Sequence, residues 1–407
     1  MLIASCAPVN NISTDKVLIK NLSVEKRQAI LKKNQINEIN TLEKQKILNR
    51  VEIILPSSSN KNITKNLINS FELSIYKKEI DNIALKINRY ESLYDLESLL
   101  KSKALPGKIF VGTLTSEATQ VVKKFCNQRI LFFSFSADKN LADECVYLVN
   151  FFPEDDLVAL FNFFPPDSKI ALLYPENHYG NNINKIINPI ALKSNAIIIS
   201  RASYNEDLSD ARDAIKELGK YELRKFELER QKKLLKNKDD EISKNALKKI
   251  QKFETIGNVD FTHIILPDYS IRLLEIAPLL PFYDVDPNKV QFVGTGVWDD
   301  ALFFDEPSLQ GAIFSGIEKN KREQFINDYF NVFRASPMRT ATIPFDLMGI
   351  ISYIIDNNLS VEEAYGLLNN SSIKFDGIDG KFLFKDNSIF RELEILQIYE
   401  GSAKKLK

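Results

Sequence analysis

The chain has 407 residues, of which 44% are apolar and 27% are charged, and this composition is typical of a globular protein with a large core. Lysine plus arginine and aspartate plus glutamate both number 54, so the formal net charge is zero. This balance argues against general nucleic-acid binding, which needs a basic excess.

The first residues carry a pattern that resembles a sorting signal. Residues 3–6, Ile-Ala-Ser-Cys, are similar to the lipobox of bacterial lipoproteins, in which the cysteine carries the lipid. Cys6 is therefore the predicted lipidation site, and residues 1–21 are interpreted as a tether. The apolar signal segment that such a motif requires is expected to lie upstream of Met1. Ala7 after the cysteine favours the outer membrane over the inner one.

Residues 22–50 are charged, with apolar positions at roughly helical spacing, and are predicted to form an N-terminal helix. Short apolar runs then alternate with amphipathic stretches. Strands are predicted at 51–56, 83–87, 108–112 and 130–134, and helices at 63–76, 96–105 and 116–125. This alternation is typical of a parallel sheet covered by helices on both faces.

The same pattern runs a second time and predicts a second lobe. Helices are predicted at 153–164, 182–192, 208–218 and 271–280, and strands at 169–174, 196–200, 262–266 and 290–293. Two further helices are expected at 321–334 and 342–357. The chain is predicted to close with an antiparallel pair, 380–384 with 392–398, joined through Asp386 and Asn387.

A charged insertion occupies residues 219–257. Its apolar residues recur at helical intervals, and the polar break at 237–240 predicts two antiparallel helices. The insertion has a surplus of lysine and arginine, but interspersed acidic residues argue against a nucleic-acid arm. Both a solvated hairpin and a docking arm for a partner protein fit this pattern.

No catalytic constellation is recognisable, so no enzymatic activity, cofactor or metal is expected. The two histidines, His178 and His263, belong to no known catalytic or metal-binding motif. Three cysteines are too few for a disulfide framework. Cys126 and Cys145 are interpreted as buried small apolar residues, and whether they pair is left open.

Four segments resemble the leucine-binding type of periplasmic protein, and the resemblance covers about residues 51–401. They are residues 132–139 (FFSFSADK), 277–287 (APLLPFYDVDP), 293–300 (VGTGVWDD) and 375–382 (FDGIDGKF). Within that superfamily the chain resembles the penicillin-binding protein activator (LppC-like) lipoproteins, which the helical insertion also favours. The resemblance implies an α/β fold of two doubly wound, Rossmann-like lobes with three crossovers, plus the helical-hairpin insertion.

The resemblance also implies a domain organisation and a ligand cleft at the carboxyl ends of the strands. Lobe I is expected at 51–152 and 317–357, and lobe II at 153–316 and 373–401, with the insertion 219–257 inside lobe II. The residues that match the family's ligand-binding positions are Thr115, Ser116, Ser136, Asp138, Tyr179, Tyr269, Trp298 and Asp299. The carboxylate of Asp138 would repel the carboxylate of an amino acid. Alternatively, Ser116 and Asp138 each cap the N-terminus of a helix.

Two functions are compatible with these features. The first is a lipoprotein that regulates peptidoglycan synthesis by contacting a penicillin-binding protein or another cell-wall enzyme. The second is a solute-binding receptor that delivers an amino acid or a similar small amphipathic ligand to an ABC permease. Either would lie on the periplasmic side of the envelope, attached to the membrane only through the lipid on Cys6.

Overall fold

The computed structural model describes residues 50–57, 61–81, 83–317 and 320–406, and these residues form two compact units. The first unit comprises the described residues up to Phe152 together with Lys319–Glu392, and the second comprises Pro153–Glu318 and Leu393–Lys407. The chain therefore passes between the units three times. The predicted tether, Cys6 and all but the last residue of the N-terminal helix lie outside the described residues.

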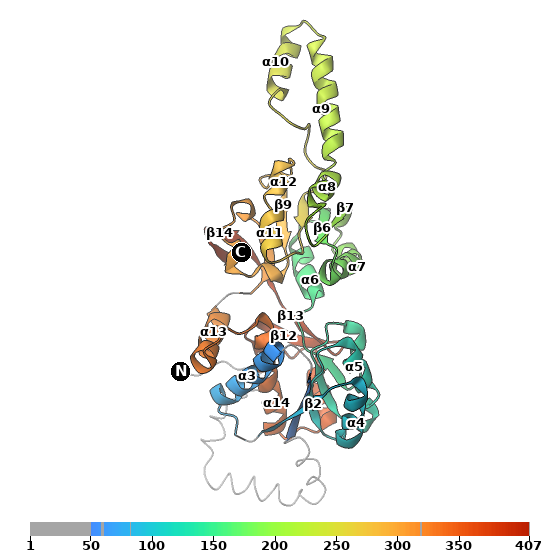
Figure 1. The fold of residues 1–407 in the computed structure, drawn as a ribbon, viewed down its shortest axis with the longest axis vertical. Coiled ribbons are helices and arrows are strands. Elements are labelled where there is room, and N and C mark those ends of the chain that lie inside the picture. The colour runs from blue at the N-terminus through green and yellow to red at the C-terminus, as the bar shows by residue number, and fades with distance from the viewer. Residues whose placement is uncertain (1–49, 58–60, 82, 318–319, 407) are drawn as a thin grey trace, which may run out of the picture. The chain divides into compact units, whose positions relative to one another are not determined.

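The first unit is built on an eight-stranded sheet in the order β11-β12-β13-β5-β4-β3-β1-β2. Figure 1 labels β2, β12 and β13 of these strands. Its strands are β1 (Arg50–Pro56), β2 (Ala84–Tyr90), β3 (Ile109–Gly112), β4 (Leu131–Ser134), β5 (Val146–Leu148), β11 (Phe375–Gly377), β12 (Gly380–Lys385) and β13 (Ser388–Arg391). Its helices are α3 (Lys61–Lys77), α4 (Leu93–Lys103), α5 (Ser116–Lys123), α13 (Asn320–Phe333), α14 (Thr342–Asp356) and α15 (Val361–Leu368). Every residue of β3, β4 and β5 is buried, as expected of parallel strands covered on both faces.

The second unit is built on a seven-stranded sheet in the order β15-β14-β10-β9-β8-β6-β7. Its strands are β6 (Lys169–Pro175), β7 (Ile197–Tyr204), β8 (His263–Ile265), β9 (Gln291–Gly294), β10 (Ile313–Gly316), β14 (Glu394–Tyr399) and β15 (Ser402–Lys405). Its helices are α6 (Pro153–Phe163), α7 (His178–Lys193), α8 (Ala211–Leu218), α9 (Tyr221–Lys236), α10 (Glu241–Ile250), α11 (Ile271–Ile276) and α12 (Leu279–Phe282). Strands β7, β6, β8, β9 and β10 run parallel, and β14 and β15 are antiparallel additions.

The closing strands correct the sequence-based prediction in two ways. Residues 373–401 do not all belong to the second lobe, because β11, β12 and β13 extend the sheet of the first unit and only β14 and β15 join the second. The predicted pair of 380–384 with 392–398 is also wrong. Strand β12 pairs instead with β13 across a tight turn in which Asp386 and Asn387 both have positive φ, as a two-residue hairpin requires.

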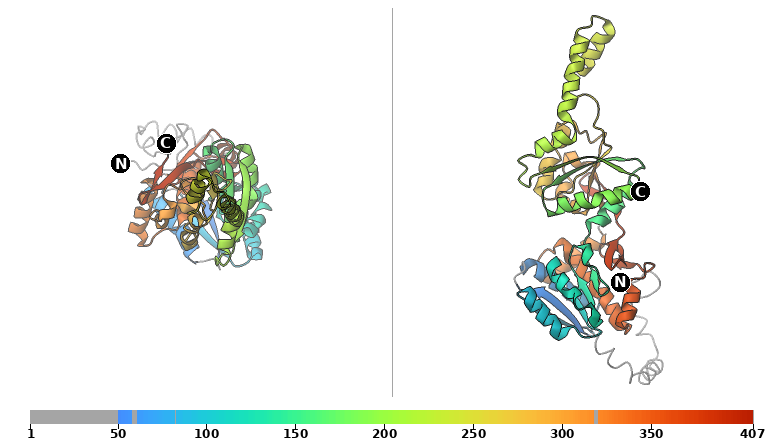
Figure 2. Two further views of the ribbon diagram at one scale, coloured as in Figure 1. Left: turned by 90° about the horizontal axis from the view of Figure 1, so that it is seen from above. Right: turned by 90° about the vertical axis from the view of Figure 1, so that its right-hand side faces the viewer.

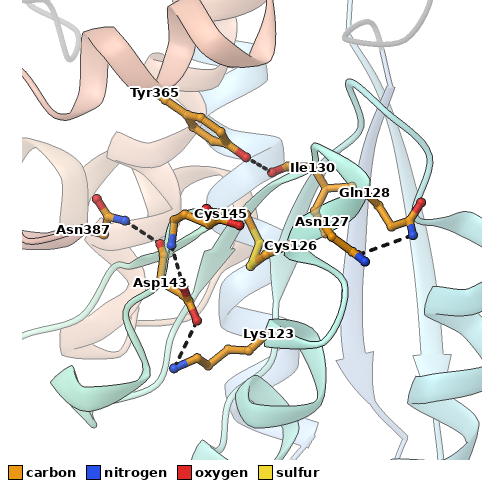
Figure 3. Close-up of a disulfide and its surroundings, with 10 residues drawn as sticks. Lys123, Cys126, Asn127, Gln128, Ile130, Asp143, Cys145, Tyr365 and Asn387 are labelled. Atoms are coloured by element: carbon orange, nitrogen blue, oxygen red, sulfur yellow. Dashed lines mark hydrogen bonds and ion pairs between the residues drawn. A yellow bond between two sulfur atoms is a disulfide. The ribbon is translucent and has the colours of Figure 1, made fainter.

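A disulfide joins Cys126 to Cys145 across 19 residues of the first unit (Figure 3). The interpretation of both cysteines as buried is correct, since their exposed fractions are 9% and 0%, but they are not free thiols. The loop they close contains β4 and ends directly before β5. Disulfides persist in oxidising compartments and are rare in reducing ones.

The insertion forms two antiparallel helices, α9 and α10, that extend away from the sheet of the second unit (Figures 1 and 2). We call residues 221–253 the arm. Its root is anchored in the unit, because the buried guanidinium of Arg224 donates to the carbonyl oxygen of Gly219 (2.9 Å) and to Oγ1 of Thr255 (2.8 Å). Leu228 is fully buried. The first turns of α9 are therefore part of the unit's packing, whereas the rest of the hairpin is mostly solvated.

Candidate functional site

In the first unit, hydroxyl side chains follow two neighbouring strands at their carboxyl ends. Thr115 caps α5, with its hydroxyl accepting from the backbone N–H of Ala118 (3.3 Å). Ser116 is the first residue of α5, Ser136 lies on the loop after β4, and their hydroxyl oxygens are 3.2 Å apart. The structure thus brings together three of the residues that the resemblance assigned to ligand binding.

A buried hydroxyl cluster holds these two loops in place. The hydroxyl oxygens of Thr113, Thr119 and Ser134 lie 2.8–3.0 Å from one another, and all three residues are fully buried. The cluster joins β3, α5 and β4 directly beneath Ser116 and Ser136. Because buried hydroxyl groups need hydrogen-bond partners, this mutual arrangement fixes the spacing of the loops.

Asp138 has a local structural role. Its carboxylate accepts from the backbone N–H of Asn140 (3.1 Å) and from the Asn140 side-chain amide (2.9 Å), and so caps the short 3-10 helix Lys139–Leu141. The backbone N–H of Asp138 donates in turn to Oγ of Ser136 (3.2 Å). Ligand contact stays a prediction for each of these four residues, Thr115, Ser116, Ser136 and Asp138.

In the second unit, two tyrosines meet at the carboxyl ends of the strands. Tyr179, in the first turn of α7, and Tyr269, after β8, pack edge to face with their ring centroids 6.3 Å apart. The hydroxyl of Tyr179 lies 2.8 Å from Oγ1 of Thr295, which follows β9. The Tyr269 side chain is 43% exposed, so the pair presents aromatic surface at this edge of the sheet.

An aspartate lies beside this pair. Asp156, in the first turn of α6, accepts through Oδ1 from the backbone N–H of Gly296 (3.0 Å) and from Oγ of Ser315 (2.7 Å). Burial and the negative charge of Asp156 raise the pKa of Tyr179, so this phenol stays protonated at physiological pH. The arrangement places a carboxylate, a threonine hydroxyl and two phenol rings within one unit.

A second, buried aspartate fixes the position of Tyr269. Asp268 is 1% exposed and accepts from the hydroxyl of Tyr204 (2.6 Å), from Nη2 of Arg272 (2.9 Å) and from the backbone N–H of Tyr269 (2.7 Å). The guanidinium of Arg272 lies 5.3 Å from the centroid of the Tyr269 ring. Hydrogen bonding to Asp268 raises the pKa of Arg272, so the cation is permanent. Tyr269 is thereby held from two sides.

Trp298, which the resemblance matched to a ligand-binding position, lies in the core of the second unit. Its side chain is fully buried, and the indole N–H donates to the carbonyl oxygen of Asp268 (3.2 Å). A Cβ at Gly294 would lie 1.9 Å from the indole ring, which explains why a glycine ends β9. Trp298 therefore supports the loop of Asp268 from the core, while Asp299 follows it in a partly exposed turn.

The sequence-based prediction named Tyr179 and Tyr269, and a ligand contact of either stays a prediction, but it did not name their neighbours. Thr295 lies in segment 293–300, which carries the resemblance, and follows a predicted strand. That position was a signal by which Thr295 could have been named as a neighbour of the site. Asp156 belongs to an acidic first helical turn, which is an ordinary N-terminal feature and gave no signal. Asp268 and Arg272 pair because they are four residues apart, one in the connection after β8 and the other in the first turn of α11.

No family model matches the sequence, and no curated protein is significantly similar to it. Solved structures match closely in fold. One, described as a branched-chain amino acid ABC transporter from Rhodospirillum rubrum, has a TM-score of 0.64 at 12% identity and covers 88% of this chain and 99% of its own. The fold is that of a type I periplasmic binding protein.

Two other proteins with the type I periplasmic binding fold are known with ligands. A solute-binding protein from Rhodopseudomonas palustris BisB5, in complex with 3,4-dihydroxybenzoic acid, has a TM-score of 0.55 at 11% identity and covers 88% of this chain and 95% of its own. A substrate-binding protein from Desulfitobacterium hafniense, in complex with leucine, has a TM-score of 0.53 at 12% identity and covers 88% and 99%. These matches confirm the predicted two-lobed α/β fold.

Within the described ranges, no helix is long and apolar enough to cross a membrane. Among the same residues, no group of three or more His, Cys, Asp or Glu side chains is arranged to hold a metal ion. His263 packs against Phe164 with ring centroids 4.4 Å apart, and burial lowers its pKa to about 4. This partly buried histidine is therefore neutral at physiological pH.

Proposed function

We propose that this protein is a solute-binding receptor that takes up a small amphipathic ligand, of the amino-acid type, at the Tyr179–Tyr269 face of its second lobe. The observation that carries the proposal is the placement of an aromatic pair beside Asp156 and Thr295 at the carboxyl ends of β6, β8 and β9. Open α/β sheets bind ligands at this edge. The ligand-bound relatives in fold, with leucine and with a dihydroxybenzoic acid, support the same class.

The chemistry of the face suits such a ligand. Two tyrosine rings supply apolar area with a preference for edge-on packing, and so favour an aliphatic or aromatic side chain. The Asp156 carboxylate, close to the Tyr179 hydroxyl, favours an ammonium or hydroxyl group over a second carboxylate. Because Asp268 and Arg272 hold Tyr269 before any ligand arrives, little ordering is needed on binding.

A ligand panel tests the proposal. We expect at least one apolar amino acid or aromatic acid to raise the melting temperature and to bind in calorimetry. Tyr179→Ala should then weaken that binding by about tenfold to hundredfold, since an aromatic anchor contributes about 1.4–2.8 kcal/mol. Tyr399→Ala is the matched control, because Tyr399 is 47% exposed on β14 of the same unit. No stabilisation by any panel member would contradict the proposal.

The second candidate is the regulator of peptidoglycan synthesis that the resemblance implies. The arm favours it, because α9 exposes Leu223 and Phe226 to solvent at 58% and 64%. Capture experiments with the anchored protein separate the two functions. Recovery of a glycosyltransferase-transpeptidase would support the regulator, whereas recovery of permease subunits would support the receptor.

We propose a periplasm-facing location with a lipid on Cys6, which the buried disulfide supports because it requires an oxidising compartment. Expressed with a lipoprotein signal peptide, the protein should partition into the detergent phase of a Triton X-114 extraction. Cys6→Ala should move it to the aqueous phase. A Cys6→Ala variant that stays in the detergent phase would rule out this anchor.

A further inference from the structure

Arg339, in the first unit, carries a guanidinium that is held in place but can be reached by solvent. The residue begins the short 3-10 helix that leads into α14. Its Nη1 donates to Oδ2 of the buried Asp379 (2.8 Å), and its guanidinium lies 4.2 Å from the centroid of the Phe151 ring. The side chain nevertheless keeps 40% of its surface exposed. Because these two contacts already fix the planar cation, it loses little conformational freedom when it binds a further group.

The guanidinium of Arg339 has hydrogen-bond donors that the described part of the chain does not use. An arginine side chain carries five N–H groups. Among the described residues, Asp379 accepts from Nη1, and no acceptor bonds to Nε or Nη2. Asp379 is also shared, because it accepts from Nε of Arg322 (3.2 Å) and from the hydroxyl of Thr342. Nε and Nη2 lie on one edge of the guanidinium, so they can donate two parallel bonds to a single carboxylate.

The position of Phe151 places this guanidinium at the carboxyl edge of the sheet of the first unit. Phe151 follows β5 by three residues. The side-chain amide of Asn150 donates to the carbonyl oxygen of Phe135 (2.7 Å) and so ties this loop to the loop after β4. Open α/β sheets bind ligands at this edge. Arg391 lies 4.3 Å from the centroid of the same ring but is only 4% exposed, so Arg339 is the guanidinium of the two that a solute can reach.

We propose that Arg339 binds a carboxylate of the solute through two parallel hydrogen bonds from Nε and Nη2, so that the ligands of this protein are acids. This inference rests on the proposed receptor function and names the group of the solute that the first unit recognises. A planar, negatively charged acceptor matches the fixed fork of an arginine better than a hydroxyl or an amide does. The Asp138 carboxylate, which would repel such a ligand, accepts from Asn140 and caps its own 3-10 helix.

Nuclear magnetic resonance of the whole, deuterated chain tests this site. The probe is 3-phenylpropionate, and 3-phenylpropionamide is its uncharged match. We expect the carboxylate to shift the Nε–H signal of Arg339 and the backbone N–H signal of Phe151 saturably, with a dissociation constant of about 1–10 mM. The amide should shift neither signal. Arg129, which pairs with Glu362 at the surface of the same unit, is the control within each spectrum, and its Nε–H signal should not move.

Variants of the two arginines show which side chain binds the probe, with the Phe151 signal as the readout. Arg339→Gln should weaken binding of the carboxylate by about tenfold to hundredfold, because a charge-assisted, bidentate contact is lost. Arg129→Gln should bind like the wild type. Arg339→Lys should also bind more weakly than the wild type, since an ammonium group does not reproduce the planar fork. Thermal melts show whether each variant folds, and Arg339→Lys carries the comparison if Arg339→Gln does not.

Four results would overturn the inference. They are the absence of a saturable shift, an equal response to the amide, an equal shift at Arg129, and an affinity that the substitution of Arg339 leaves unchanged. The titration reads the first unit alone, so it separates this inference from the proposed function. A solute whose binding falls in Tyr179→Ala but not in Arg339→Gln would support the receptor and overturn the acid site. Probe binding at Arg339, with no ligand found in the panel, would support the acid site and contradict the receptor.

Discussion

Replacing Asp379 by asparagine should lower the free energy of unfolding of the first unit by about 3–5 kcal/mol, the largest effect we expect from a single substitution. Asp379 is 2% exposed and accepts from Nε of Arg322 (3.2 Å) and from Nη1 of Arg339 (2.8 Å). It also accepts from the hydroxyl of Thr342. Removing its charge would take an ionic partner from the buried guanidinium of Arg322.

Asp379 and the arginines around it, which we call the Asp379 cluster, lie next to the points where the chain passes between the units. Arg322 lies just after the second passage of the chain between the units, and Arg391 just before the third. The guanidiniums of Arg339 and Arg391 lie 4.2 Å and 4.3 Å from the centroid of the Phe151 ring, next to the first passage. Through these arginines, the Asp379 carboxylate holds in place the first-unit end of each of the three connections between the units.

The same cluster predicts an acid-sensitive stability. Burial alone would raise the pKa of Asp379, but the charges of Arg339, Arg322 and Arg391 outweigh it and lower the pKa to about 2 from its ordinary value of 3.8. A carboxyl with a depressed folded pKa stabilises the protein fully above the unfolded value and loses that contribution as the pH falls through the folded one. The difference in unfolding free energy between the wild type and Asp379→Asn should therefore decrease as the pH falls from about 4 to about 2.

Asp376→Asn is the matched control, because Asp376 pairs with Lys321 at the surface of the same unit, where a salt bridge contributes about 0–1 kcal/mol. Urea unfolding at several pH values measures both variants. Equal stabilities of Asp379→Asn and Asp376→Asn at pH 7 would show that the cluster does not stabilise the first unit in this way.

Loss of the disulfide is expected to have the second-largest effect. The double variant Cys126→Ala, Cys145→Ala should lower the unfolding free energy of the first unit by about 3 kcal/mol, because a 19-residue loop is no longer closed in the unfolded chain. That corresponds to a fall in melting temperature of about 6–12 °C for a unit of this size. The surroundings shown in Figure 3 should persist, since Lys123 still pairs with Asp143 and Asn387 still donates to the Asp143 carbonyl oxygen.

Reductant provides an independent check of the disulfide. Dithiothreitol should lower the melting temperature of the wild type towards that of the double variant and leave the double variant unchanged. Cys6→Ala should melt like the wild type under both conditions. A wild type whose melting temperature is insensitive to the reductant would mean that the bond does not form in solution.

The local pattern of the sequence was enough to predict the two-lobed fold, because each parallel strand is a short apolar run between amphipathic helices. It also predicted the two helices of the arm, since the polar break at 237–240 interrupts a helical spacing. Tyr179 and Tyr269 were named as site candidates only through the resemblance. The strands, the helices and the polar break of the arm depend on neighbours in sequence, which composition and periodicity report directly.

Only the tertiary structure decided which sheet each closing strand joins. Strands β13 and β14 are both short and largely buried, and their patterns are alike, yet β13 pairs with β5 and β14 with β10. Ser388 pairs with Leu148 across most of the chain, and no local signal encodes such a pairing. The disulfide, the ion cluster around Asp379 and the burial of Trp298 were decided in the same way. In each case the partners are distant in sequence or separated by a turn, so only the packing of the folded units brings them together.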